Sequence, residues 1–456
     1  MNMSRLLVRH YKILVASGIL VLQQNVSFAA GFALIEHSAS GVGNAFAGSA
    51  AVAEDASTIY FNPAGLSHLK GNQVVAAGHF IGPKISYDDQ NSKTFNGSDT
   101  LNGSSSSEGA TNAQVPNLYM SSTFKNGVSF GLGINVPFGL TTEYDDDWVG
   151  RYHGVKSEML TVNINPSFAL KFNKNLSMGV GLNIQKIDVT LTSAVDFGGI
   201  CIAQFPAASC ASFGLAPQQN DGFATISGDS WSTGLNFGLL ANITKQTRVG
   251  LSYRAGVSHT ISGSADFAVP FEAQILTSSG LFTDTDAKAR LKLPAVASLS
   301  MMHSFSSKTQ LLADVTWTEW SSFQELRIEY PDSPQPSSVT TSAWKDAYRL
   351  SLALNQKLMS KVKLRLGTAY DYSPLPGANH RTPRIPGSDR IWLSTGLGID
   401  VIKSVHLDIG YAHLFAGKEN SNNTLESEQV PTINHTLVGE FQSSVDIVSA
   451  QVVWIF

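Results

Sequence analysis

Hydrophobic and polar residues alternate with a period of two along most of the chain. Between Leu176 and Ile184, apolar side chains at even positions alternate with Ser, Gly and Asn. Segments 249–257 and 362–370 repeat this pattern, and in 291–305 one face carries Leu291, Leu293, Ala295, Ala297, Leu299 and Met301. Because successive side chains of a strand point to opposite faces, the pattern predicts strands with one apolar face each. A soluble β-sandwich would show the same alternation.

The connections between these runs are of two kinds. Short polar turns, mostly centred on a lysine, lie at 125–127, 173–175, 245–246, 307–308, 360–361 and 403–404. Long polar connections lie at about 88–115, 143–155, 196–230, 270–289, 331–343, 373–389 and 416–440. Six short turns and seven long loops require 14 strands, and an even number is typical of single-chain bacterial transmembrane barrels.

Composition fits a barrel with two opposed faces. The 456 residues include 31 basic and 35 acidic ones, and only 14% are charged, whereas soluble domains have roughly 25%. The mean hydropathy is +0.01, as expected when an apolar outer face and a polar lumen average out. This composition excludes a basic nucleic-acid binder, a disordered charged chain and a cysteine-rich scaffold.

The first 29 residues have the pattern of a secretory signal peptide. Basic residues at Arg5, Arg9 and Lys12 precede a short apolar run at 13–22, and Ser27-Phe28-Ala29 has the small-x-small form of a cleavage site. A retained anchor is the alternative, but the run falls short of the about 20 apolar residues that a helix needs to cross a bilayer. We expect an exported protein with residues 1–29 removed.

Residues 30–72 do not alternate and are rich in Ala, Gly and Ser. About 40 residues are too few for a convincing independent core, so this segment is either a periplasmic extension or a plug packed inside the barrel. A 14-stranded barrel is wide enough to leave an aqueous pore unless it is filled. We therefore predict an all-β protein, with an antiparallel transmembrane barrel at 73–456 and a small, partly helical N-terminal hatch at 30–72 that plugs the lumen.

The chain ends on one face of an alternating strand, with Val448, Ala450, Val452, Trp454 and Phe456. A terminal aromatic residue is typical of outer-membrane barrels of Gram-negative bacteria, where the barrel assembly machinery recognises it. The alternative is that the pattern marks an ordinary buried C-terminal strand. Aromatic residues near strand ends are expected to form girdles among the outer-membrane lipid and lipopolysaccharide; they are Trp317, Trp320, Tyr330, Trp392 and Tyr411.

Several motifs, in order along the chain, resemble the FadL family of outer-membrane transporters for long-chain fatty acids and other hydrophobic compounds. They are Gly31-Phe32, Ser40-Gly41-Val42-Gly43, Ala53-Glu54-Asp55, Asn62-Pro63-Ala64, Ile134-Asn135-Val136-Pro137-Phe138-Gly139-Leu140, Trp344-Lys345-Asp346-Ala347-Tyr348-Arg349 and Asp389-Arg390-Ile391-Trp392-Leu393-Ser394. The resemblance implies 14 strands, a hatch, and passive transport by binding in an apolar lumen pocket, hatch rearrangement and lateral exit through the wall.

The resemblance also points to particular residues. Phe32 and Phe138 become candidates for residues of the ligand pocket. The hatch motif Asn62, Pro63 and Ala64 becomes a candidate for the gate that opens when the hatch rearranges. Pro137 and Gly139 would form an inward kink in the third strand, because proline removes a ladder donor and glycine often marks a bend. The alternatives are ordinary plug packing for the hatch residues and an extracellular strand end for 136–139.

The sequence departs from the family where a carboxylate would be bound. The two positions that are basic in fatty-acid transporters fall on Ser193 and near Thr340. Either another basic residue replaces them, with Lys186, Arg384 and Arg390 as candidates, or the ligand is a less acidic hydrophobic molecule such as an aromatic hydrocarbon. Lys345, Asp346 and Arg349 are expected to form a charge network in the lumen.

Other chemistry is not indicated. Cys201 and Cys210 lie in one long loop, where an oxidising compartment favours a disulfide over two free thiols, and two cysteines do not suggest a metal site. His303, His406 and His413 lie on predicted strands without nucleophile-elbow spacing, so a barrel enzyme such as a phospholipase is disfavoured. An open porin is a further alternative. We expect a monomer without cofactor, metal, enzyme activity or nucleic-acid partner.

Overall fold

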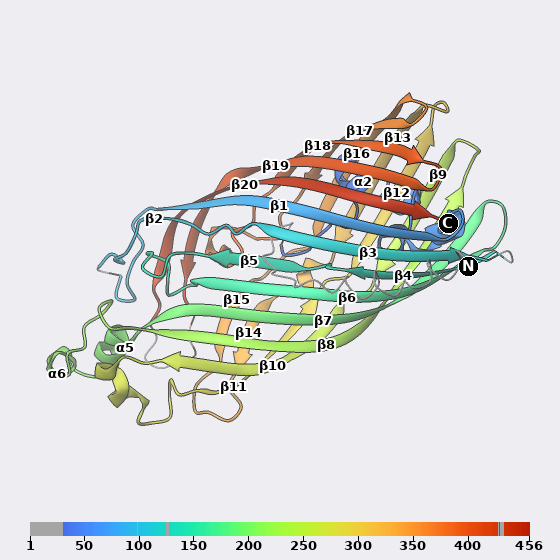
Figure 1. The fold of residues 1–456 in the computed structure, drawn as a ribbon. Coiled ribbons are helices and arrows are strands. Elements are labelled where there is room, and N and C mark those ends of the chain that lie inside the picture. The colour runs from blue at the N-terminus through green and yellow to red at the C-terminus, as the bar shows by residue number, and fades with distance from the viewer. Residues whose placement is uncertain (1–30, 98, 125–126, 427, 429–432) are drawn as a thin grey trace, which may run out of the picture.

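The computed structural model describes residues 31–97, 99–124, 127–426, 428 and 433–456, and these form a closed antiparallel β-barrel around a small helical segment (Figure 1). The predicted signal peptide at 1–29 lies outside the described residues. The strand segments are β1 (Gln73–Asp89), β2 (Ser106–Glu108), β3 (Ala113–Thr123), β4 (Val128–Asn135), β5 (Gly139–Glu143), β6 (Lys156–Lys171), β7 (Leu176–Asp196), β8 (Asp221–Asn242), β9 (Thr247–Arg254), β10 (Val257–Ala268), β11 (Thr285–Leu293), β12 (Val296–Ser304), β13 (Thr309–Thr318), β14 (Glu325–Glu329), β15 (Ser338–Thr341), β16 (Ala347–Met359), β17 (Val362–Asp371), β18 (Arg390–Ile402), β19 (Val405–Thr424) and β20 (Thr436–Ile455).

These 20 segments make up 14 barrel strands, because six strands are each interrupted once. The split strands are β2/β3, β4/β5, β9/β10, β11/β12, β13/β14 and β15/β16. The barrel closes where β1 pairs with β20, from Gln73 opposite Ile455 to Asp89 opposite Gly439. The strand number predicted from the turn count is confirmed.

The short turns lie together at one end of the barrel, as predicted. Five connect strand ends that the structure describes, and the sixth includes residues 125 and 126, which lie outside the described residues. At the other end the strands are longer than predicted: β8 begins at Asp221 and β19 ends at Thr424. Backbone pairing continues there because hairpins such as β7–β8 extend to Asp196 opposite Asp221.

The two faces of most strands have opposite character. On β7, Met178 and Val180 point outward and are 42% and 41% exposed, whereas Ser177 and Asn183 are buried on the lumen side. The wall thus carries an apolar outer belt over a polar lumen, as membrane-spanning strands require.

We expected the apolar residues of 291–305 to share one face of a strand, and this expectation is wrong. Leu291 and Leu293 are buried toward the lumen, but Leu299 is 53% exposed on the outside and Ser300 is buried. The strand is broken between β11 and β12, at residues 294–295, and an interruption of regular pleating changes which face later residues occupy. The girdle expectation fails at Trp320 and Trp392, which are both buried.

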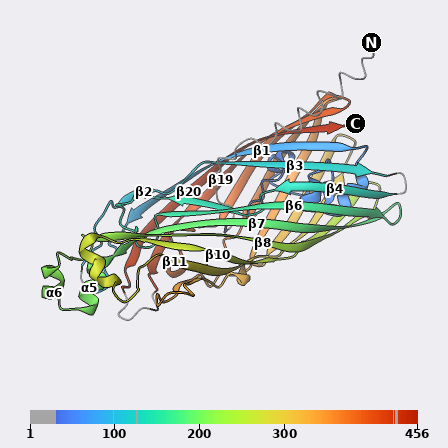
Figure 2. The same ribbon diagram turned by 60° about the horizontal axis from the view of Figure 1, so that its bottom comes forward.

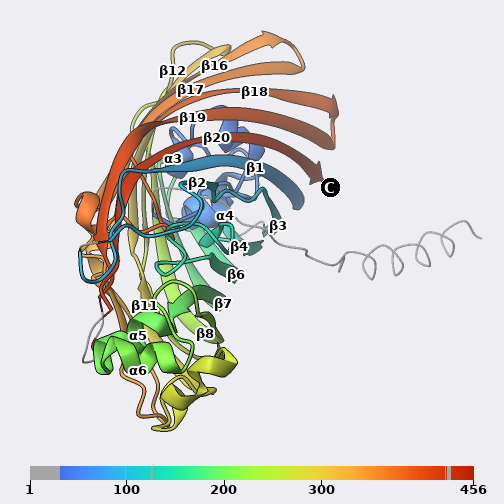
Figure 3. The same cartoon turned by 90° about the vertical axis from the view of Figure 1, so that its left-hand side faces the viewer.

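The N-terminal segment forms short helices inside the barrel near the short-turn end. They are α2 (Ala39–Gly43), α3 (Ser49–Val52), α4 (Thr58–Phe61) and the 3₁₀ helix η1 (Pro63–His68). Helix α2 contacts β18 and β19, α3 contacts β9 and β12, and η1 contacts β6, β7 and β8. Figure 3 shows α3 and α4 enclosed by the strands. The hatch is therefore anchored on several sides of the wall.

The long loops at the opposite end carry further helices (Figure 2). These are α5 (Phe197–Gln204), α6 (Ala207–Ser212), η2 (Phe271–Thr277) and η4 (Ala378–His380), whereas η3 (Trp320–Ser322) lies in the interruption between β13 and β14. Within the described part of the chain, every helix is too short or too polar to cross a bilayer.

Candidate functional site

Phe32 lies at the centre of an aromatic cluster in the lumen. Its ring centroid is 4.6 Å from that of Trp320, 5.6 Å from that of Phe323 and 5.7 Å from that of Trp344. Phe138, from the interrupted third strand, lies 6.2 Å away on the other side. All five side chains are at most 6% exposed. The two aromatic residues singled out from the sequence, Phe32 and Phe138, therefore lie in one cluster.

An apolar cavity adjoins this cluster on the side of the long loops. Its space between atoms amounts to about 750 Å³, and this includes a part that is open to solvent. Strands β6, β7, β8, β10 and β11 supply its walls, with Met159, Val189, Leu191, Ile226, Ile261 and Leu291 among the lining residues. Phe32 and Phe323 form one boundary, and Lys288 and Arg384 are its charged lining residues.

The third barrel strand is interrupted beside this cavity. β4 ends at Asn135 and β5 begins at Gly139. The strand is therefore interrupted at 136–138, which includes Pro137. The hatch pairs with the interruption: Leu34 N donates to Pro137 O at 2.9 Å, and Gly139 N donates to Phe32 O at 2.9 Å. The hatch therefore makes strand-like hydrogen bonds with the interrupted segment of the third strand.

The barrel wall is incomplete at the same place. Strands β3 and β4 pair as far as Leu118 opposite Ile134, and the same register returns only at the bridge between Ala110 and Thr142. All residues in between are described, and no ladder pair joins 112–117 to 135–140. The third strand therefore separates from the second where the hatch pairs with it.

The hatch motif Asn62-Pro63-Ala64 docks tightly on the wall. Asn62 is fully buried, and its Nδ2 donates to Ala50 O at 2.7 Å and to Leu239 O of β8 at 2.9 Å. Its Oδ1 accepts from Ala64 N at 3.0 Å. One side chain therefore joins two parts of the hatch to a barrel strand, while Pro63 begins η1.

Two barrel glycines make this docking possible. A Cβ atom at Gly238 would lie 1.9 Å from Asn62 Oδ1, and one at Gly179 would lie 2.3 Å from Ala64 N. Any larger residue at either place would displace the hatch motif.

A charged cluster also fastens the hatch, near the short-turn end. Glu54 forms ion pairs with Lys363 at 2.6 Å and Arg365 at 2.7 Å, and Arg365 pairs with Asp408 at 2.7 Å. Burial raises the pKa of Glu54, but Lys363 and Arg365 outweigh it and hold this pKa well below its usual value. Sequence reasoning missed this cluster, although Glu54 lies in one of the matched motifs.

The three charges expected to form one lumen network do not come together. Arg349 is buried and lies 3.8 Å from Asp314 of β13. Asp346 instead accepts a hydrogen bond from Trp317 Nε1 at 3.0 Å, and Lys345 is exposed. The reason is local: Lys345 and Asp346 precede β16, which begins at Ala347, and only Arg349 lies on the lumen face of that strand.

The three basic candidates for ligand binding occupy different surroundings. Lys186 forms an ion pair with Asp188 at 2.6 Å, on the opposite face of β7 from the buried Ile187. Arg390 is buried and paired with Asp371 at 2.7 Å. Arg384 lines the apolar cavity. Of these three, only Arg384 lies at the cavity.

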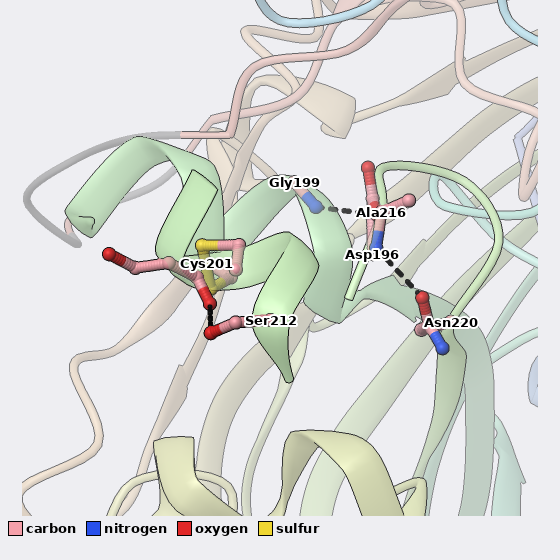
Figure 4. Close-up of a disulfide and its surroundings, with 8 residues drawn as sticks. Asp196, Gly199, Cys201, Ser212, Ala216 and Asn220 are labelled. Atoms are coloured by element: carbon pink, nitrogen blue, oxygen red, sulfur yellow. Dashed lines mark hydrogen bonds between the residues drawn. A yellow bond between two sulfur atoms is a disulfide. The ribbon is translucent and has the colours of Figure 1, made fainter. Parts of the chain in front are cut away.

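The loop at 197–220 is closed by a disulfide between Cys201 of α5 and Cys210 of α6 (Figure 4). At its base, Asp196 Oδ1 accepts from Gly199 N at 2.8 Å and from Gln218 N at 2.9 Å. These contacts hold the helical loop against the end of β7.

Among the residues that the structure describes, no group of three His, Cys, Asp or Glu side chains is arranged to hold a metal. The cavity offers mainly apolar surface, and burial of a hydrocarbon there stabilises binding by about 0.8 kcal/mol per CH₂. This arrangement suits reversible binding of a hydrophobic molecule.

Comparison with known proteins places this architecture among related sequences. Residues 20–456 match the family described as "Outer membrane protein transport protein (OMPP1/FadL/TodX)". The chain is 29% identical over 403 residues to the long-chain fatty acid transport protein of Escherichia coli O6:H1, covering 86% of this chain and 88% of that protein.

Two solved structures share the fold. A FadL homologue of Pseudomonas aeruginosa superposes with a TM-score of 0.82 at 23% identity, covering 94% of this chain and all of that one. The toluene transporter TodX of P. putida gives a TM-score of 0.69 at 16% identity, with 92% and 98% coverage. Both likenesses extend over nearly the whole described chain and support the barrel fold.

Proposed function

Because the chain belongs to the OMPP1/FadL/TodX family of outer membrane transport proteins, we propose that it moves long-chain fatty acids or related hydrophobic compounds passively across the outer membrane. The observation that carries this proposal is the apolar cavity between the long loops and the hatch. An apolar chain gains about 0.8 kcal/mol per buried CH₂, so partitioning alone can draw a ligand into the cavity. The role is transport, not catalysis.

The route we propose leads from the loops through the cavity to the side of the barrel. A ligand in the cavity touches Phe32, whose carbonyl oxygen is hydrogen-bonded to Gly139 of the third strand. Displacement of Phe32 would therefore release the kinked segment. The incomplete pairing between β3 and the third strand then gives a lateral exit toward the membrane, while the Asn62 contacts hold the rest of the hatch.

A neutral aromatic hydrocarbon is the second candidate ligand. The observation that favours it is the aromatic cluster of Phe32, Trp320, Phe323 and Trp344 at the cavity, because aromatic rings pack well in edge-to-face arrangements. The relative TodX is described as a toluene transporter.

We also propose how the barrel reaches and occupies the membrane. Trp454 and Phe456 are 40% and 58% exposed on the outer face of the last strand, which leaves them accessible to the assembly machinery and then to lipid and lipopolysaccharide. One closed barrel contains the whole route, so we propose that a monomer is sufficient.

Uptake by intact cells tests this function. Cells that lack other transporters of this type are given labelled oleate or labelled toluene, with and without this protein. We expect the protein to increase uptake of at least one compound. If neither rate depends on the protein while the folded barrel is present in the outer membrane, the proposed function is wrong.

A further inference from the structure

Arg384 is a basic residue held at the loop-side boundary of the apolar cavity. It lies in the loop between β17 and β18 and lines the cavity together with Leu191 and Ile385. Gly154 allows the close approach, because a Cβ atom there would lie 3.1 Å from the guanidinium carbon. The loop therefore places a guanidinium against a cavity whose remaining walls are largely apolar.

The hydrogen bonds of Arg384 fix its position without neutralising it. Nη1 donates to Lys156 O at 3.0 Å and to Ser157 Oγ at 2.8 Å, and Nη2 donates to Thr192 O at 3.0 Å. All of these acceptors are uncharged. Among the described residues, Nε makes no hydrogen bond and no carboxylate lies within ion-pair distance of Arg384.

Three buried arginines of the lumen differ in this respect. Arg349, Arg365 and Arg390 each face a carboxylate, from Asp314, from Glu54 and Asp408, and from Asp371 respectively. Arg254 has no such ion pair, but its guanidinium lies 4.3 Å from the centre of the Tyr60 ring and donates to Tyr60 O. Arg384 combines a cavity-lining position with the lack of an acidic partner.

Arg384 is half-buried beside apolar walls. A cation that is partly removed from water without a counter-ion is costly, and an anionic ligand would offset that cost. Burial lowers the pKa of Arg384 to about 10, so the group is still charged at neutral pH. The edge formed by Nε and Nη2 retains donors, and this edge of a guanidinium matches the two oxygens of a carboxylate.

We propose that Arg384 binds the carboxylate of the transported ligand while the ligand's hydrocarbon tail fills the adjoining cavity, so that this chain selects long-chain monocarboxylates over neutral hydrocarbons. The inference rests on the proposed transport function and adds to it the chemical class of the ligand. Arg384 thereby takes the part that Ser193 and Thr340, which are not basic, cannot take.

Binding of two matched ligands tests this selection. The purified full-length protein is titrated with oleate and with methyl oleate, which has the same tail without the charge, at a pH where oleate is ionised. We expect oleate to bind about ten- to hundredfold more tightly, as charge-assisted hydrogen bonds imply. Arg384→Gln should remove this preference by weakening oleate alone, and Arg384→Lys should restore part of it.

Arg381→Gln is the matched control. Arg381 lies in the same loop but pairs with Glu419 at 2.9 Å and does not line the cavity, so the preference for oleate should persist. The inference is overturned if wild-type protein binds both ligands alike, or if Arg384→Gln weakens both equally. If the Arg384→Gln variant does not fold, the inference is tested by the ratio of oleate to methyl oleate affinity in the wild-type protein and in the Arg384→Lys variant. If the wild-type protein binds neither ligand, the transport function itself fails.

Discussion

Glu36 is a carboxyl group that the hatch buries almost completely, at 2% exposure. Its Oε2 accepts a hydrogen bond from Ile35 N at 3.0 Å. Burial raises the pKa of Glu36 from 4.5 to about 7, against the smaller opposing effect of Arg390 and Arg349. Because the folded-state pKa lies above the unfolded one, the protonated form stabilises the hatch at low pH, and this contribution is lost as the pH rises from about 4.5 through 7.

We therefore predict that amide-exchange protection of residues 31–72 falls between pH 5 and pH 8, by up to roughly 3 kcal/mol in opening free energy. Glu36→Gln should flatten this dependence, since the amide has no proton to lose. Protection of strand amides in β19 serves as the internal reference. An unchanged pH dependence in the Gln variant would show that another group is responsible.

Single residues differ in how far the sequence reveals them. The resemblance to the family singled out Phe32 and Phe138, and the structure places Phe32 at the cavity and Phe138 in the aromatic cluster beside it. The sequence could not show which of Lys186 and Arg384 lies at the cavity. The face of β7 that Lys186 occupies depends on the exact pairing of that strand, and the position of Arg384 depends on the conformation of a long loop. The Glu54 cluster was missed because its partners on β17 lie more than 300 residues away in the sequence.

The hatch and the barrel strands meet at backbone distance, and this contact can be tested at Gly238. An alanine there would place its Cβ atom 1.9 Å from Asn62 Oδ1, and relieving such overpacking costs about 1–3 kcal/mol. We predict that Gly238→Ala loosens α4 and η1, measured as faster protease cleavage within 31–72 and more frequent channel openings in planar bilayers.

Gly78→Ala on β1 is the matched control, because nothing lies within 4 Å of a Cβ atom at that position. It should behave like the wild-type protein in both assays. Equal behaviour of the two variants would mean that close docking at Gly238 does not hold the hatch.

The helical loop between β7 and β8 depends on its disulfide. Closing a loop of about ten residues stabilises it by roughly 2.5–3 kcal/mol in the chain-entropy account. Both cysteines are buried in an apolar cluster that this loop shares with Ala273, Leu276 and Phe282 of the β10–β11 connection. We predict that replacing Cys201 and Cys210 together by Ser speeds protease cleavage within 197–220, whereas the heat-modifiable gel mobility of the barrel stays unchanged. Loss of the folded barrel instead would contradict a purely local role.

The elements themselves were predicted to different degrees. The alternation and the lysine-centred turns were sufficient to predict the number of 14 strands, because one face of each strand contacts lipid and the other contacts the lumen. The interruption at 294–295 was not predicted, because Leu291, Leu293 and Leu299 continue the same period while facing opposite sides. The reversal occurs beside the cavity, where apolar residues line the lumen.

For the whole molecule, the consequence is a barrel whose lumen holds the hatch. The hatch bonds with the third strand at Phe32 and Leu34, with β8 at Asn62 and with β17 at Glu54. A hydrophobic molecule that enters from the loops therefore meets the apolar cavity before it meets the hatch. We therefore expect transport to depend on occupancy of that cavity.

A bulky side chain that fills the cavity tests whether transport depends on its occupancy. Val189 of β7 lines the cavity, whereas its neighbour Thr190 points to the outer face of the same strand. Initial rates of oleate uptake are measured in cells with equal amounts of folded barrel carrying Val189→Trp or Thr190→Trp. We predict that Val189→Trp lowers uptake close to the level of cells without the protein, while Thr190→Trp keeps the wild-type rate. Wild-type uptake by the Val189→Trp protein would contradict it.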